Sequence, residues 1–137
     1  MLQYVVFLTV LATALACAPG GEPAYIALFT EEIYTSANDA LYKQQATKIL
    51  TDALAKHGIT YDPSWVTIGA RPSFNRVVID VYIRGGVDCK TLPDFVKDMI
   101  QANVLVSGAG MRCGTNPDVN YVNNDTRQGK NSPKKSL

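Results

Sequence analysis

The segment RVVIDVYIR, residues 76–84, constrains the fold more than any other stretch of the chain. Its odd-numbered residues are all valine or isoleucine, while the even-numbered ones include two arginines, an aspartate and a tyrosine. This period of two is typical of a β-strand that has one face in a hydrophobic core. We therefore expect a sheet with one buried face and a second face that carries Asp80, Tyr82 and Arg84.

The two ends of the 137-residue chain differ in composition from the middle. Val5–Ala16 is an uncharged apolar run, too short to span a bilayer, and a Pro/Gly break follows it, which is typical of a secretory signal peptide. We expect residues 1–16 to be the signal peptide, residues 17–23 a short linker and residues 114–137 a disordered polar tail. The protein is then secreted and extracellular, with no stable membrane span.

Residues 24–113, between these ends, are expected to form one domain of the α+β class. A helix is predicted to begin near Ser36 and to end before Gly58, and a second helix is predicted to begin near Thr91. Runs of aromatic and branched residues predict three strands besides 76–84, at Tyr25–Thr30, Trp65–Ile68 and Val104–Val106.

The predicted order of strand, helix, strand, strand, helix, strand is the split arrangement of ferredoxin-like folds. Right-handed crossovers place both helices on one face of a four-stranded antiparallel sheet with the spatial order 4-1-3-2, and they leave the other face open. Cys89, before the second helix, and Cys113, after the fourth strand, then lie at the same end of the domain. We expect them to form a disulfide, which suits an exported protein.

Two further residues are candidates for modification. Cys17 is left without a partner, so it is free, paired with a second chain, or lipidated, because Ala14-Leu15-Ala16-Cys17 also resembles a bacterial lipoprotein cleavage box. Asn124 begins an Asn-Asp-Thr acceptor for N-glycosylation, which we expect to be accessible in a secreted eukaryotic chain.

The chain lacks the sequence patterns of a catalytic or metal site. Its single histidine, His57, is expected at the end of the first helix and has no nearby residues at metal-ligand spacing. No nucleophile, phosphate-binding or zinc motif occurs. A net charge of +1 gives no electrostatic basis for binding nucleic acid. We predict that the protein is not an enzyme and uses no cofactor or metal.

The open face of the predicted sheet is the candidate functional surface. It mixes tyrosine and arginine, which are enriched among the anchors of protein interfaces. Asp80 and Arg84 are expected to pair along it. We expect this face to bind an extracellular protein or to mediate self-association, through Tyr25, Phe29, Asp80, Tyr82 and Arg84.

The stretch RPSFNRVVIDV, from Arg71 to Val81, resembles the second-hairpin region of SEA domains, extracellular modules of mucins and other glycosylated surface proteins. The resemblance covers about residues 24–108 and implies the same split fold. SEA domains that cleave themselves use a strained Gly-Ser bond, whereas Ser73 follows Pro72 in this chain. We therefore predict that autoproteolysis is absent and that residues 71–75 are an ordinary loop.

The sequence favours a small secreted, non-enzymatic binding module and leaves two alternatives open. Propeptide-like inhibitors of subtilisin-type proteases use the same split fold and present an extended C-terminal segment, which residues from Gly114 onward would supply. A small-molecule carrier is the other alternative, although no pattern in the chain indicates a cavity.

Overall fold

The computed structural model describes residues 21–101 and 103–124. The expected signal peptide, Cys17 and the residues after Asn124 therefore lie outside the described part of the chain. In chain order the elements are β1 (Glu22–Ile33), the short 3-10 helix η1 (Ser36–Asn38), α2 (Asp39–Lys56), β2 (Val66–Ser73), β3 (Arg76–Val87), α3 (Leu92–Gln101), β4 (Val106–Cys113) and β5 (Asn120–Asn123).

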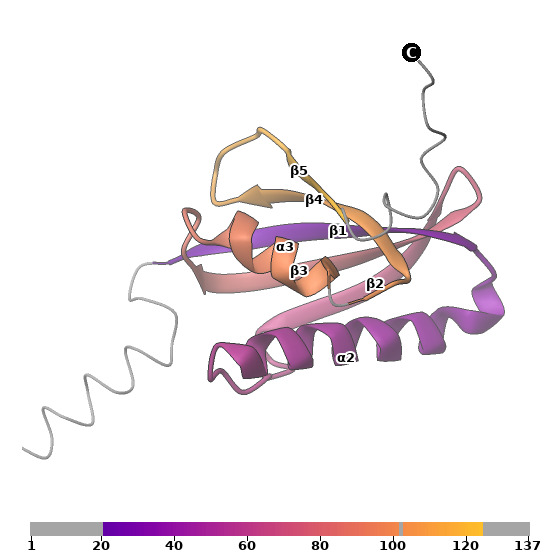
Figure 1. Cartoon of the computed structure of the whole chain (residues 1–137), viewed down its shortest axis with the longest axis horizontal. Coiled ribbons are helices and arrows are strands. Elements are labelled where there is room, and N and C mark those ends of the chain that lie inside the picture. The colour runs from indigo at the N-terminus through magenta and orange to yellow at the C-terminus, as the bar shows by residue number, and fades with distance from the viewer. Residues whose placement is uncertain (1–20, 102, 125–137) are drawn as a thin grey trace, which may run out of the picture.

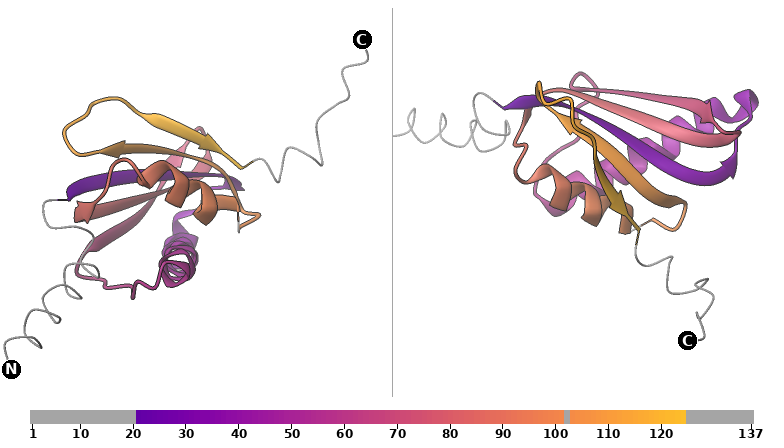
Figure 2. Two further views of the ribbon diagram at one scale, coloured as in Figure 1. Left: turned by 60° about the vertical axis from the view of Figure 1, so that its left-hand side comes forward. Right: turned by 90° about the horizontal axis from the view of Figure 1, so that it is seen from above.

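The strands form one antiparallel sheet in the order β2-β3-β1-β4-β5. The first four keep the spatial order expected from the sequence, and both helices pack on the same side of the sheet (Figure 1 and Figure 2). The expected total of four strands is wrong, because β5 adds a strand at the edge beside β4. Neither described helix covers the other side, which we call the open face.

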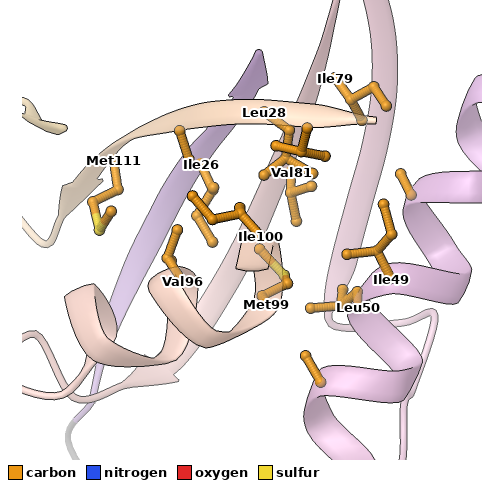
Figure 3. Close-up of a cluster of buried hydrophobic side chains, with 14 of the residues drawn as sticks. Ile26, Leu28, Ile49, Leu50, Ile79, Val81, Val96, Met99, Ile100 and Met111 are labelled. Atoms are coloured by element: carbon orange, nitrogen blue, oxygen red, sulfur yellow. The ribbon is translucent and has the colours of Figure 1, made fainter. Parts of the chain in front are cut away.

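The hydrophobic core lies between the sheet and the two helices. The alternation in β3 is confirmed, since Val77, Ile79 and Val81 are at most 3% exposed. Leu50 of α2 and Ile100 of α3 pack against this face, and both are almost fully buried (Figure 3). Burying a side chain of this size contributes about 1.5–3 kcal/mol relative to leaving it exposed. The core therefore fixes which side of each strand remains open.

β2 and β3 are joined by a two-residue turn at Phe74 and Asn75. Both residues have positive φ angles, 48° and 62°, the backbone of a type I′ hairpin turn. Ser73 pairs with Arg76 as the last residue of β2. The expected loop at 71–75 is therefore wrong for residues 71–73, which extend the strand.

β4 lies further along the chain than the strand predicted at Val104–Val106. It runs through Gly108 and Gly110, which the sequence analysis interpreted as the end of the strand. A Cβ at Gly108 would lie 2.9 Å from the carbonyl oxygen of Val122, and one at Gly110 would lie 3.3 Å from the ring of Tyr121. Glycine at these positions lets β5 approach the strand closely, so it does not end the strand.

The prediction of a disordered tail from residue 114 is wrong for residues 120–124. β5 pairs with β4 from Gly108 to Met111, and the backbone N–H of Asn124 donates to the carbonyl of Ser107 over 3.0 Å. The polar sequence of β5 does not indicate a strand, because β5 is stabilised by backbone pairing with β4 and not by a large apolar face.

Asn124 fixes the end of β5 against the connection between α3 and β4. Its side chain is only 1% exposed. Its Nδ2 donates to the carbonyls of Ile100, Asn103 and Val106 at 2.9, 3.1 and 2.8 Å. An amide nitrogen has two hydrogens, so at least one hydrogen is shared between two acceptors. The expectation that this glycosylation acceptor is accessible is wrong for the folded state.

Candidate functional site

The open face collects side chains from all strands of the sheet. Strand alternation places Tyr25 of β1 directly between Tyr82 of β3 and Arg112 of β4. All residues predicted for the interaction surface lie on this face. Its residues are Trp65 directly before β2, Thr67 and Arg71 of β2, Tyr25 and Phe29 of β1, Arg76, Val78, Asp80, Tyr82 and Arg84 of β3, Arg112 of β4, and Tyr121 of β5.

A polar network crosses the middle of the open face. The Arg71 Nε donates to Asp80 Oδ2 over 2.6 Å, and the Tyr25 hydroxyl donates to Asp80 Oδ1. The expected pair between Asp80 and Arg84 is wrong, because the tight turn before β3 brings Arg71 next to Asp80 from the neighbouring strand. One carboxylate thus joins side chains from β1, β2 and β3.

Arg112 extends this network to β4. Its guanidinium carbon lies 5.9 Å from the centre of the Tyr25 ring, within the range of a cation–π contact. Burial raises the pKa of Tyr25 above its ordinary value, and the hydrogen bond to the Asp80 carboxylate raises it further. The same carboxylate raises the pKa of Arg71. The contacts therefore hold the tyrosine protonated and the guanidinium charged.

The pKa shift of Tyr25 predicts how the network responds to alkaline pH. Its folded pKa is raised above the unfolded value, so its contribution to stability is fully present below the unfolded pKa and is lost as pH rises through the folded pKa. We expect the difference in tyrosinate absorbance between wild type and Tyr25→Phe to show a tyrosine that titrates above the ordinary value of 10.0. Asp80→Asn should move this titration down towards that value, and an unchanged titration would contradict the assigned cause.

An apolar cluster occupies the part of the open face over β4 and β5. A side chain at Gly110 would contact Tyr121, Val119 and Phe29 at 3.3, 3.4 and 3.5 Å, so these three surround the glycine. Phe29 is half-buried, and Val78 next to it is only 3% exposed. The aromatic residues thus cover part of the sheet, and Tyr121 remains 72% exposed.

The opposite part of the open face, over β2 and β3, also carries exposed side chains. Tyr82 is 44% exposed and Trp65 is 39% exposed, while the backbone N–H of Arg84 donates to the carbonyl of Trp65 over 3.0 Å. Tyr82 and Arg84 of β3 and Trp65, directly before β2, therefore lie side by side with their side chains reachable by solvent. This combination of residue types is enriched at the anchors of protein interfaces.

The contributors to the surface that the sequence analysis missed include Arg71, Arg112 and Tyr121. Arg71 was placed in a loop, Arg112 beyond the end of a strand and Tyr121 in the tail. The two-residue turn at Phe74 and Asn75 was the available signal for Arg71, since it fixes the register of the hairpin. No comparable signal in the sequence indicates β5.

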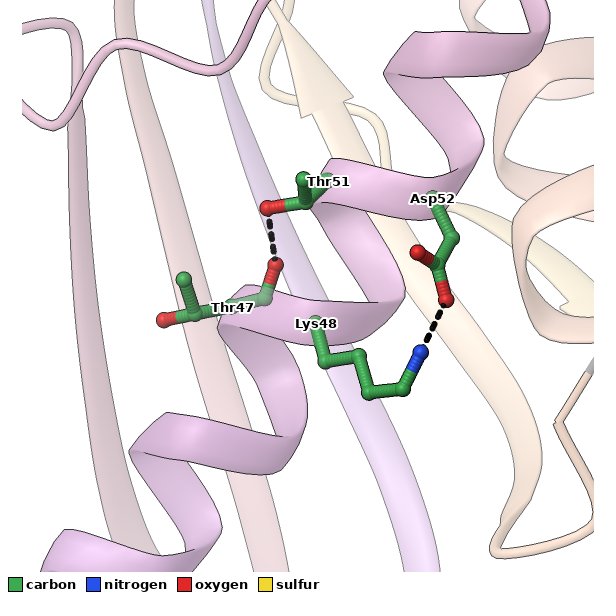
Figure 4. A network of polar contacts seen from close by, with 4 residues as sticks. All are labelled: Thr47, Lys48, Thr51 and Asp52. Carbon is green, nitrogen blue, oxygen red and sulfur yellow. Dashed lines mark hydrogen bonds and ion pairs between the residues drawn. The ribbon is translucent and has the colours of Figure 1, made fainter.

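A narrow groove of about 260 Å³ lies between α2 and α3 on the other side of the sheet. Its floor offers little apolar surface, because Ile49, Ala53 and Met99 are only 7%, 6% and 2% exposed. At its rim Lys48 and Asp52 form an ion pair at 2.7 Å, which Figure 4 shows beside the Thr47–Thr51 contact. These polar contacts form within α2, so the groove is a weaker candidate than the open face.

His57 ends α2 as the sequence predicts, and its ring lies 5.4 Å from the ring of Phe95. Within residues 21–101 and 103–124, no three His, Cys, Asp or Glu side chains converge as they would around a metal ion. Neither α2 nor α3, the helices of the described part, is both long and apolar enough to cross a membrane.

A comparison with protein families gives one match. The model of the family described as secreted clade V proteins matches residues 24–120, which is most of the chain. The chain belongs to this family. No curated protein and no solved structure matches it. The match supports the predicted secretion, and it extends past the predicted domain end at residue 113 to the first residue of β5. It names secreted clade V proteins and not SEA domains, so the SEA resemblance remains a prediction.

A disulfide joins Cys89 and Cys113 in this secreted clade V protein, as the sequence predicts. The two Cα atoms are 5.6 Å apart and are separated by 24 positions in the sequence. The bond ties the turn before α3 to the end of β4, directly beyond Arg112. It therefore restrains the end of β4 that carries Arg112.

Proposed function

We propose that this secreted clade V protein is a non-enzymatic binding module whose open face contacts an extracellular protein. The supporting observation is the polar network in which Arg71, Asp80, Tyr25 and Arg112 join four strands on one uncovered side of the sheet. Side chains that are held in place before binding lose less conformational freedom on association, so they favour a contact surface.

The exposed residues beside the network supply the rest of such a surface. Tyr82 and Trp65 each have a partly exposed aromatic side chain, and Arg84, two positions after Tyr82 on β3, is exposed. A few buried aromatic and arginine residues usually carry most of the affinity of an interface. Tyr82 and Arg84 are therefore the proposed anchors, and the surrounding residues provide shape.

The double variant Tyr82→Ala with Arg84→Ala tests this function. Because both side chains are exposed, we expect the free energy of unfolding to change by about 0.5 kcal/mol or less for each substitution. Capture of partners from the native extracellular fluid, or self-association in sedimentation, should weaken by more than about 1 kcal/mol.

The matched control is Leu41→Ala with Lys43→Ala on α2, which removes an apolar side chain of similar exposure, 47%, together with a cation. The control should behave like wild type in capture and sedimentation. If both double variants captured the same partners as wild type and had the same mass in sedimentation, the open face would not be a contact surface.

A protease-directed module was the alternative from the sequence. It requires the segment from Gly114 onward to be extended and available to a protease. β5 and the buried Asn124 hold residues 120–124 against the domain, so that segment would first have to leave the sheet. The binding module is therefore the function that the geometry supports better.

A further inference from the structure

Arginine and lysine occupy opposite sides of the described molecule. Its arginines, Arg71, Arg76, Arg84 and Arg112, are all on strands, at positions where alternation points them to the open side. The lysines of residues 21–101 and 103–124 are all on α2, on α3 or in the turn before α3, namely Lys43, Lys48, Lys56, Lys90 and Lys97. Within the part of the chain that the structure describes, the cations of the open face are therefore all guanidinium groups.

The four guanidinium groups differ in how far other groups of the described residues already engage them. Arg71 is paired with Asp80, and Arg76 donates to the backbone carbonyl of Glu31. Neither Arg84 nor Arg112 forms an ion pair with another residue of the described part of the chain. Arg112 is nevertheless held in place by its contact with the Tyr25 ring. The open face thus retains two cations that a partner can use.

The sheet fixes the spacing of these two cations. β3 and β4 flank β1, so Arg84 and Arg112 are two strand spacings apart, about 10 Å, and are offset by one row of open-face residues, about 7 Å along the strands. The diagonal between their Cα atoms is then about 12 Å, and Tyr82 and Tyr25 lie between them. In an extended peptide, residues four positions apart lie on the same face at a similar distance, about 13 Å.

We propose that the open face binds an acidic, extended segment of a protein, with one carboxylate on Arg84, a second four positions away on Arg112, and an apolar residue between them over Tyr82. This inference rests on the proposed function and specifies the chemistry of the partner. The planar guanidinium fork donates two parallel hydrogen bonds to a carboxylate, which a lysine ammonium cannot match.

A sulfated polysaccharide would be another source of negative charge. A polyanion is held through a dense field of cations, whereas this face has two unpaired guanidinium groups with aromatic side chains between them. The aromatic side chains favour a partner that also contributes apolar surface. The protein segment is therefore the occupant that fits the face.

The test is an NMR titration of the full secreted chain with the blocked peptide Gly-Glu-Thr-Val-Thr-Glu-Gly. Its matched probe has glutamine in place of both glutamates. The acidic peptide should shift backbone amide signals of β1, β3 and β4, and the glutamine peptide should bind at least about tenfold more weakly. The double variant Arg84→Gln with Arg112→Gln should bind the acidic peptide more weakly than wild type by a similar factor. Lys48→Gln with Lys56→Gln, on the helical side, should change binding less than about twofold.

Three outcomes would overturn the inference: equal binding of the two peptides, equal binding by the arginine variant, or tighter binding of a heparin tetrasaccharide than of the acidic peptide. These outcomes are distinct from failure of the proposed function. If Tyr82→Ala with Arg84→Ala abolished partner capture while the peptides failed to bind, the face would still be a contact surface and only the carboxylate chemistry would be wrong. If Tyr82→Ala with Arg84→Ala left partner capture unchanged, both the proposed contact surface and the proposed acidic partner would be wrong.

Discussion

Replacing Cys89 and Cys113 with serine should lower the free energy of unfolding by about 3 kcal/mol, because the bond closes a loop across 24 positions of the chain. The loss comes mainly from the larger conformational freedom of the unfolded chain once the loop is opened. Urea unfolding followed by circular dichroism measures the change, with Cys17→Ser in both proteins to prevent thiol exchange.

A reducing agent provides the control for this experiment. It should lower the urea midpoint of the protein with both cysteines to that of the double variant, and it should leave the variant unchanged. Equal stability of the oxidised and reduced proteins would mean that the bond contributes nothing to the fold. Partner capture by the double variant, measured at a urea concentration below its unfolding transition, would report whether the position of Arg112 depends on the disulfide.

Asn124→Asp should release β5 from the domain. The substitution replaces an amide that donates to three carbonyls with a carboxylate that faces the same three oxygens in a buried site. A carboxylate held against three carbonyl oxygens in a buried site costs about 3–5 kcal/mol, which opposes the docking of β5. Hydrogen exchange should therefore show loss of protection at the β5 amides and at the β4 amides that pair with them.

Asn123→Asp is the matched control, since it makes the same chemical change at the adjacent, exposed position of the same strand. It should leave the β5 amides protected. The defect of Asn124→Asp should also be smaller in acid, because a protonated carboxyl regains one donor for the carbonyls. Equal protection of the two variants would show that Asn124 does not hold the strand.

The parts of the fold that follow from apolar periodicity could be predicted from the sequence. The alternation in residues 76–84 identified β3 and its buried face, and the helical stripe that includes Leu50 identified α2. The spatial order of four strands then followed from handedness, and it brought Cys89 and Cys113 together. Each of these features depends on the burial of apolar side chains, and that burial is visible in the sequence as a periodic pattern of apolar residues.

The parts that depend on backbone approach and on single hydrogen bonds could not be predicted. Gly108 and Gly110 have low strand propensity, yet they lie within β4 because β5 needs the space above them. Composition does not reveal that Asn124 satisfies three carbonyls. The residues named for the predicted surface share one face of the sheet, while its function as a surface stays a prediction. The partner predicted for Asp80 was wrong, because the hairpin register brings Arg71 to it.

The burial of Asn124 sets an order of events for a chain that enters a glycosylating secretory pathway. The nitrogen that would carry the sugar is the same Nδ2 that donates to the carbonyls of Ile100, Asn103 and Val106. A glycan on that nitrogen leaves one hydrogen and too much bulk for a site that is 1% exposed. Folding and sugar transfer therefore compete for one atom, and whichever happens first excludes the other. A glycosylated chain would keep β4 as an unprotected edge for its whole lifetime, so a mixed population would contain two forms of the same sequence with different sheet edges.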